Sequence, residues 1–322
     1  MGFLVVATDP HHSDFRAELE ELSAIGAEFR AAQCKTENDV AEACRDADGI
    51  LVTFSPIGRR ALTAMPRCRI VVRTGVGYDT IDIAAATERR VMVANVPDYC
   101  ISEVADHALA LILCLWRKVV DLDAQVRAQG WTSMLRPVGR LEGRVLGIIG
   151  LGRIGRAVAT RTWGFGLRRI AYDPYMSADV FSTLGVESVS LDVLVRSADI
   201  ITLHTPLSQE TRGLIRTEIL RQMKPNAILV NTSRGGVVAT EDLVQALREG
   251  WISGAGLDVF ETEPLPQDHP LRNLPRVLLT PHAAWYSADS EQELRRRSAR
   301  TVVKALQGEV PPGLLNPEVL AR

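Results

Sequence analysis

The sequence contains few cysteines, and they are not arranged in pairs. There are five, Cys34, Cys44, Cys68, Cys100 and Cys114, and no two of them have C-x-x-C spacing. An odd, unpaired set of this kind argues against a disulfide framework or a zinc site. It fits a reducing compartment, so we expect a cytoplasmic protein, and no group of residues has the spacing of metal ligands.

A strong charge of one sign and a long apolar run are also missing. The formal net charge is −2, which provides no field to attract nucleic acid or anionic lipid. The longest apolar run, residues 108–116, is about half as long as a membrane span. The first residues lack the basic region and cleavage site of a signal peptide. We therefore expect no nucleic-acid partner, no membrane partner and no leader.

What the sequence does contain is an alternation of short apolar strands and amphipathic helices. Its 322 residues, 46% of them hydrophobic, suggest two domains with ordinary cores. Continuous apolar strands separated by helices are typical of parallel sheets covered on both faces. We expect strands at residues 3–8, 49–54, 69–75, 144–150, 168–173, 199–205, 226–233, 252–259 and 276–282.

The second alternation marks a second α/β domain. Residues 102–126 predict one long helix that is apolar at its centre, and Pro97 lies in a linker before it. The charged helix near the end of the chain is expected to fold back onto the first unit. We therefore expect one domain at 1–98 and 286–322 and the other at 99–285.

A glycine motif is the sharpest chemical signal. Gly150, Gly152 and Gly155 form G-x-G-x-x-G, with Arg153 and Ile154 between the last two glycines. The motif follows an apolar strand and opens a helix, whose N-terminal N–H groups favour phosphate. The glycines permit a tight turn, close approach of a pyrophosphate and close helix–strand packing. The alternative is a chance glycine cluster in a tight turn, but the context favours dinucleotide binding.

An acid follows at the spacing that this motif requires. Asp173 ends the next predicted strand. A carboxylate there accepts hydrogen bonds from a ribose 2′-hydroxyl and repels a 2′-phosphate. The cofactor is therefore expected to be NAD rather than NADP.

Three later strand ends carry polar groups that suit proton transfer. Arg234 follows one strand, Asp258, Glu261 and Glu263 follow the next, and His282 follows the last. Alone, each acid is more simply a solvated loop residue, whereas Arg234 is equally a surface arginine in a glycine turn and His282 a polar cap on a loop. Together, a guanidinium, a carboxylate and an imidazole make a set that binds an anionic substrate and moves a proton. A carboxylate beside an imidazole orients the ring and favours its protonated form.

Other candidates are less distinctive. Backbone N–H groups of Val76 and Gly77, after a strand of the first domain, could form a small anion nest or an ordinary turn. His204 ends a strand and would line the cofactor cleft. His107 lies in the apolar helix, where a satisfied core histidine is the simpler interpretation.

Several motifs in order resemble one family over nearly the whole chain. "RTGVGYDTID", "GLGRIG", "NTSRG", "DVFETEP" and "TPHAAW" are similar to the D-isomer-specific 2-hydroxyacid dehydrogenases. "PHAAWYS" resembles the branch that contains the C-terminal binding proteins, NAD-sensing corepressors, and their bacterial relatives. The resemblance implies two doubly wound parallel-sheet domains, with a Rossmann NAD-binding domain inserted in a discontinuous flavodoxin-like substrate domain. It also implies a homodimer.

The resemblance assigns roles to particular residues. The catalytic arginine, glutamate and histidine of the family fall on Arg234, Glu263 rather than Glu261, and His282. The family's aspartate for the nicotinamide carboxamide falls on Asp258. The other cofactor residues would be His204, Thr205, Pro206, Thr232 and Ser233, and the substrate residues would be Arg73, Val76, Gly77 and Trp285. Trp285 would face a substrate side chain, or alternatively pack beneath a loop.

The implied activity is hydride transfer between NAD(H) and a small 2-oxo or 2-hydroxy acid, with His282 as general acid and base. Two alternatives remain open. One is a phosphoglycerate dehydrogenase or a glyoxylate/hydroxypyruvate reductase; a substrate phosphate would need cations such as Arg73, Arg136 or Arg153. The other is an NAD(H)-gated, dimeric, corepressor-like binding protein.

Overall fold

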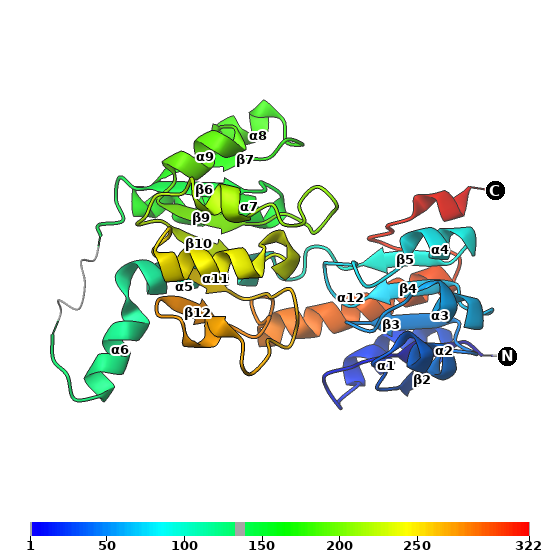
Figure 1. Cartoon of the computed structure of the whole chain (residues 1–322). Coiled ribbons are helices and arrows are strands. Elements are labelled where there is room, and N and C mark those ends of the chain that lie inside the picture. The colour runs from blue at the N-terminus through cyan, green and yellow to red at the C-terminus, as the bar shows by residue number, and fades with distance from the viewer. Residues whose placement is uncertain (1, 133–138, 322) are drawn as a thin grey trace. The chain divides into compact units, whose positions relative to one another are not determined.

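The structure is a computed structural model that describes residues 2–132 and 139–321, and these form two compact units (Figure 1). Unit 1 combines Met1–Tyr99 with Ser287–Arg322, and unit 2 is Cys100–Tyr286. Each unit has its own parallel sheet and its own cores. The roles of the two units, substrate binding and cofactor binding, stay predictions.

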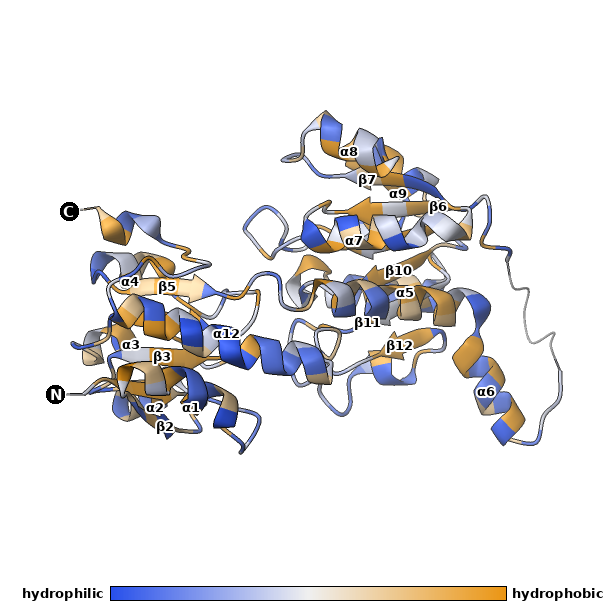
Figure 2. Ribbon diagram, turned by 180° about the vertical axis from the view of Figure 1, so that it is seen from behind, coloured by the Kyte–Doolittle hydropathy of each residue, from blue (hydrophilic) through white to orange (hydrophobic). Residues whose placement is uncertain are grey.

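Within the described residues, unit 1 contains a five-stranded parallel sheet of order β2-β1-β3-β4-β5. Its strands are β1 (Leu4–Ala7), β2 (Glu28–Ala31), β3 (Gly49–Val52), β4 (Ile70–Arg73) and β5 (Met92–Asn95). The apolar side chains of β1, β3 and β4 are buried along their length, and Figure 2 shows the hydrophobic character of β3. Burial on both faces explains why these strands are continuously apolar rather than alternating.

Helices cover both faces of this sheet. They are α1 (Arg16–Leu22), α2 (Glu37–Ala43), α3 (Arg59–Ala64), α4 (Ile83–Glu88) and α12 (Ala288–Leu306), with short 3₁₀ turns at Ser23–Ile25 and Pro317–Leu320. One core lies under α2, α3 and α4, and the other lies under α1 and α12. Helix α12 packs so closely that a Cβ added to Gly49 would lie 2.7 Å from Val302 Cγ1. The last long helix is thus part of the same unit as β1.

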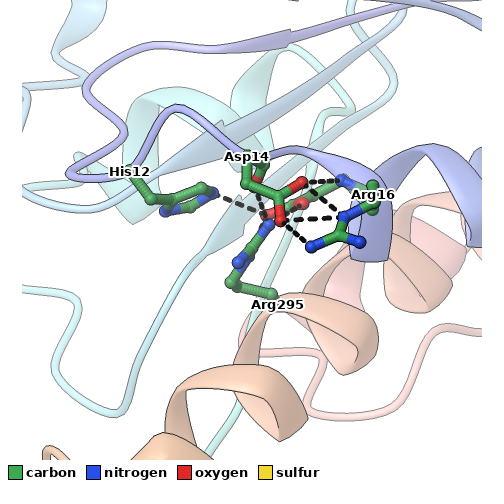
Figure 3. Close-up of polar contacts among 5 residues, drawn as sticks. His12, Asp14, Arg16 and Arg295 are labelled. Carbon is green, nitrogen blue, oxygen red and sulfur yellow. Dashed lines mark hydrogen bonds and ion pairs between the residues drawn. The ribbon is translucent and has the colours of Figure 1, made fainter.

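A buried ion pair ties α12 to α1. Arg295 donates from Nε and Nη2 to the two carboxylate oxygens of Glu18, at 2.8 Å each, and His12 Nε2 lies 3.0 Å from Glu18 Oε1. Figure 3 shows His12 and Arg295 converging beside the Asp14–Arg16 pair. Burial disfavours the ionised carboxylate, but the hydrogen bond from Arg295, a backbone hydrogen bond and the charges of Arg295 and His12 outweigh it and lower the pKa of Glu18.

In the described part of unit 2, a seven-stranded parallel sheet has the order β12-β11-β10-β9-β6-β7-β8. The strands are β6 (Val145–Ile149), β7 (Arg168–Tyr172), β8 (Glu187–Ser188), β9 (Ile200–Leu203), β10 (Ile228–Asn231), β11 (Gly254–Leu257) and β12 (Val277–Leu279). The chain winds outward from β6 to β7 and then returns to β9 on the other side of β6. Such a reversal of strand order creates a crevice at the carboxyl ends of the strands, where ligands bind in open α/β sheets.

The helices of unit 2 also cover both faces. They are α5 (Ile101–Arg117), α6 (Val119–Arg127), α7 (Arg153–Arg161), α8 (Ala178–Leu184), α9 (Leu191–Ser197), α10 (Thr217–Leu220) and α11 (Thr240–Glu249), with 3₁₀ turns at Thr162–Phe165, Gly235–Val237 and Pro270–Asn273. Helices α5, α7 and α8 pack on one face, and α9, α10 and α11 on the other. No described helix is long and apolar enough to span a bilayer.

The expectation of one helix over residues 102–126 is wrong. Lys118 adopts a left-handed conformation with φ of 56°, which ends α5 at Arg117 and starts α6 at Val119. A left-handed residue cannot continue a right-handed helix. The apolar periodicity runs across the break, so it did not reveal the break.

Replacing Arg295 with Ala tests the buried ion pair of unit 1. We expect the free energy of unfolding to fall by about 3 kcal/mol, because the Glu18 charge would stay buried without its main partner. Arg296→Ala is the matched control: its pair with Glu20 is exposed on both sides, and such pairs contribute about 1 kcal/mol or less. Equilibrium urea unfolding measures both, and equal losses would contradict this account.

Candidate active site

The loop between β6 and α7 requires glycine at two of its three motif positions. Gly150 has φ of +89°, and a Cβ there would lie 2.7 Å from the carbonyl of His204. A Cβ on Gly155 would lie 2.1 Å from the oxygen of Gly150. Around Gly152 the Cβ position is open, with no atom within 4 Å. Gly152 is the N-cap of α7. The first N–H groups of that helix therefore lie beside open space, as binding of a pyrophosphate requires.

Buried polar atoms without partners lie at the ends of the two neighbouring strands β9 and β10. They are His204 Nδ1, Thr205 Oγ1 and Thr232 Oγ1, which find no hydrogen-bond partner among the described residues. Burial lowers the pKa of His204 to about 3, so the imidazole is neutral, and its Nε2 lies 2.9 Å from Thr202 Oγ1. An unpaired buried polar atom costs about 1–3 kcal/mol, which a ligand with hydroxyl and amide groups would offset. These residues therefore fit a dinucleotide.

The remaining residues predicted to contact the cofactor lie around the same strand ends. Asp173 accepts from the N–H groups of Leu151 at 2.7 Å and Tyr175 at 2.9 Å. Each carboxylate oxygen has about two acceptor sites, so Asp173 can still accept from a ribose. Arg153 and Pro206 are exposed, and Ile154 is partly buried. Ser233 donates to Asn231 Oδ1 at 2.9 Å.

Three neighbouring strands bring the proton-transfer candidates to one edge of the sheet. Arg234 follows β10, Glu263 follows β11 and His282 follows β12, and these strands are adjacent. His282 Nδ1 lies 2.7 Å from Glu263 Oε2. Glu263 Oε1 accepts from the N–H of Phe260 at 2.9 Å, and Arg234 Nη1 donates to the oxygen of Ser233 at 2.8 Å.

The carboxylate of Glu263 is stabilised in its ionised form. Burial favours the neutral acid, but the hydrogen bond and charge of His282, the N–H of Phe260 and the charge of Arg234 outweigh it and lower the pKa of Glu263. Glu261 lies elsewhere: its Oε2 accepts from the N–H of Thr240 at the start of α11, at 2.9 Å. Of the two glutamates, Glu263 is therefore the one that the structure pairs with the imidazole.

Asp258 lies beneath the loop that carries His282 and is only 1% exposed. Its Oδ1 accepts from Thr280 Oγ1 at 2.6 Å and from the N–H of Ala283 at 2.9 Å. Its Oδ2 accepts from the N–H of Ala284 at 2.9 Å. The sequence suggested a cofactor role for Asp258 but gave no sign of these bonds to the loop, because they join residues over 20 positions apart.

Trp285 follows this loop and is partly buried, with its ring in an edge contact with Tyr286 at 5.5 Å between centroids. Its predicted place in a substrate pocket stays a prediction. Among the described residues, no group of three His, Cys, Asp or Glu side chains is placed to hold a metal ion.

The predicted substrate residues of the other unit lie after β4. Arg73 is 8% exposed and donates to the oxygen of Thr74 at 2.8 Å. A Cβ on Gly75 would lie 1.3 Å from Arg73 Nη1, so the guanidinium occupies the space over that glycine. The oxygen of Val76 accepts from Asn95 Nδ2 at 2.6 Å, and Gly77 is partly buried. Their contact with a substrate stays a prediction, and Arg136 lies outside the described residues.

The glycine loop predicts opposite results for two alanine substitutions. Gly152→Ala should change the free energy of unfolding by less than about 1 kcal/mol but weaken NADH binding at least tenfold, because the methyl group would fill the open phosphate position. Gly155→Ala should destabilise the fold, because its Cβ would overlap the oxygen of Gly150. Gly164, whose Cβ position is also open, provides the control.

Fluorescence titration with NADH and urea unfolding measure these effects. Gly164→Ala should leave both unchanged. Wild-type NADH affinity in Gly152→Ala would contradict the assignment of this loop to the phosphates.

Replacing His282 with Ala should raise the pKa of Glu263. Its hydrogen bond and charge partner would be lost while burial, which favours the neutral acid, would remain. Carbon-13 NMR titration of glutamate-labelled protein measures this pKa. His269→Ala is the control, because the His269 side chain accepts a local hydrogen bond from the N–H of Leu271. An unchanged pKa of Glu263 would mean that the ion pair does not form in solution.

Comparison with known proteins supplies the family. Residues 109–284 match the family model described as "D-isomer specific 2-hydroxyacid dehydrogenase, NAD binding domain". The glyoxylate reductase of Korarchaeum cryptofilum (strain OPF8) is 44% identical over 286 residues, which cover 87% of this chain and 86% of that protein. The D-3-phosphoglycerate dehydrogenase of Mycobacterium leprae (strain TN) is 42% identical over 272 residues, which cover 84% of this chain and 51% of that protein.

A solved structure agrees with these matches. The D-lactate dehydrogenase from Aquifex aeolicus, complexed with NAD and lactic acid, has a TM-score of 0.86 and 29% identity, over 95% of this chain and 96% of that chain. The expected α/β fold, NAD as cofactor and an oxidoreductase that acts on a CH–OH group are confirmed. The chain therefore belongs to the D-isomer specific 2-hydroxyacid dehydrogenase family.

Proposed function

We propose that the protein interconverts a small 2-oxo acid and its D-2-hydroxy acid, with His282 as general acid and base. The observation that carries this proposal is the pair of His282 Nδ1 and Glu263 Oε2, 2.7 Å apart, at the strand edge that also presents Arg234. NAD, when bound, supplies or accepts the hydride. The residues of the chain bind the acid, orient it and move the proton.

The proton is assigned to a particular nitrogen. Because Nδ1 of His282 faces Glu263, Nε2 is the ring atom that gives a proton to the substrate oxygen during reduction and takes it back during oxidation. Glu263, whose pKa is lowered, stays ionised and stabilises the positive imidazolium. Arg234 binds the substrate carboxylate and carbonyl oxygen, for which a planar guanidinium is suited.

We favour an unphosphorylated acid such as those related to glyoxylate. The chain resembles relatives named glyoxylate reductase and D-3-phosphoglycerate dehydrogenase at similar sequence identity, so identity alone does not decide whether the substrate is phosphorylated. A phosphorylated acid would need an accessible cation near the substrate. Arg73 is 8% exposed and bonded to its own loop, and the exposed Arg153 lies in the glycine loop that we assign to the cofactor. The partly buried indole of Trp285 offers apolar surface instead.

The proposal includes a homodimer in the cytoplasm. Helix α6 and the residues after it present exposed apolar side chains: Val119, Val120, Val126 and Trp131, the last 91% exposed. A second copy of the chain is the proposed cover for this face. Cys34, Cys44, Cys68 and Cys114 are free thiols, and burial raises the pKa of the Cys44 and Cys68 thiols to about 12, which fits a reducing compartment.

The corepressor-like alternative rests on "PHAAWYS" and remains the rival. It predicts tight NADH binding without turnover of any 2-oxo acid.

Replacing His282 with Ala tests the catalytic proposal. We expect kcat to fall by about 10³-fold, the range for loss of a general acid, while Kd for NADH stays within about twofold. NADH consumption and fluorescence titration measure the two quantities, and His269→Ala serves as control. Turnover near the wild-type rate in His282→Ala would overturn the assigned role.

A further inference from the structure

A series of side-chain hydrogen bonds runs from the centre of α5 to the loop that carries His282. His107 Nε2 lies 3.0 Å from Thr280 Oγ1, and Thr280 Oγ1 lies 2.6 Å from Asp258 Oδ1. His107 Nε2 is also 3.7 Å from the same Asp258 oxygen, with side-chain exposures of 25% for His107 and 1% for Asp258. The inward residues of α5 are otherwise apolar, so this histidine is the exception on its face.

Counting protons fixes the direction of these hydrogen bonds. A threonine hydroxyl has one proton, and an ionised carboxylate can only accept. Thr280 therefore donates its one hydrogen bond to Asp258, and it accepts a hydrogen bond from His107. Nε2 of His107 is therefore the ring nitrogen that carries the donated hydrogen. The hydrogen bonds run from His107 to Thr280 and from Thr280 to Asp258.

Asp258 passes this arrangement on to the catalytic loop. Its side chain accepts from the N–H groups of Ala283 and Ala284, and its carbonyl accepts from the N–H of His282 at 2.8 Å. His282 itself is left-handed, with φ of 53°, a conformation that a non-glycine residue adopts only when its surroundings hold it. The backbone N–H groups of residues 282–284 are thus all bonded to one buried residue, Asp258.

We propose that His107 is a positioning residue for the reaction. By donating to Thr280 it fixes the hydroxyl that holds Asp258, and Asp258 holds His282 in the orientation in which the imidazole meets the substrate. This inference rests on the proposed function, because it concerns the same imidazole. It adds a residue of α5 that acts on His282 through Thr280 and Asp258.

Two substitutions of His107 separate the hydrogen bond from the volume of the ring. His107→Phe keeps an aromatic ring but removes the donor, and His107→Gln keeps an N–H donor near the position of Nε2. We expect His107→Phe to lower kcat about tenfold, because small displacements of a catalytic group have large effects on rate. KM and the Kd for NADH should stay within about threefold, and His107→Gln should restore kcat to within about threefold of the wild type.

A double mutant tests whether the effect passes through Thr280. Thr280→Val should lower kcat at least as much as His107→Phe, and the double variant should be no slower than Thr280→Val alone, because both remove one chain of bonds. Thr183→Val is the control: its hydroxyl bonds only locally to the oxygen of Asp179, on the exposed side of α8. Multiplied losses in the double variant would overturn the pathway.

Amide hydrogen exchange gives a readout that needs no turnover. The N–H groups of Ala283 and Ala284 should exchange at least about tenfold faster in His107→Phe and Thr280→Val, and at the wild-type rate in His107→Gln. Unchanged exchange together with unchanged kcat in His107→Phe would overturn the inference alone. Absence of any 2-oxo acid turnover by the wild type would instead overturn the proposed function, and with it the catalytic part of this inference.

Discussion

The site depends on three parallel strands that end side by side. Because β10, β11 and β12 are adjacent and run in one direction, residues far apart in the chain arrive at one edge of the sheet. The 2.7 Å contact between His282 Nδ1 and Glu263 Oε2 follows from that arrangement. An antiparallel strand among these three would place its polar end on the opposite side of the unit, and His282, Glu263 and Arg234 would then not come together.

The carboxyl ends of these strands and of β9 carry two kinds of polar group, which differ in whether the chain itself supplies their hydrogen-bond partners. Asp258 accepts three hydrogen bonds from neighbouring residues of the chain, and these hold the loop of His282 before any ligand arrives. His204, Thr205 and Thr232 carry buried atoms that the described residues leave without partners. Preorganised groups lower the cost of reaching the reactive geometry, whereas unpaired groups gain by binding a ligand.

Patterns confined to one strand and its turn could be read from the sequence. The glycine loop and the burial of β6 depend on neighbours within a few positions, so they were predictable. Strand β2 is largely exposed, so it has no apolar pattern and was not predicted. The break between α5 and α6 at Lys118 lies within a continuous apolar periodicity, so it was not predicted either. The contact of His107 with Thr280 spans 173 positions, and periodicity gave no sign of it.

The most direct test of the central claim is NADH consumption by the wild-type protein with a panel of 2-oxo acids, combined with chiral analysis of the product. The panel includes glyoxylate, hydroxypyruvate, 3-phosphohydroxypyruvate, phenylpyruvate and 4-methylthio-2-oxobutyrate, with NADPH in parallel. We predict fast turnover of at least one unphosphorylated acid with NADH and, where the product is chiral, the D-hydroxy acid. Tight NADH binding without turnover of any acid, or an L-hydroxy acid as product, would contradict it.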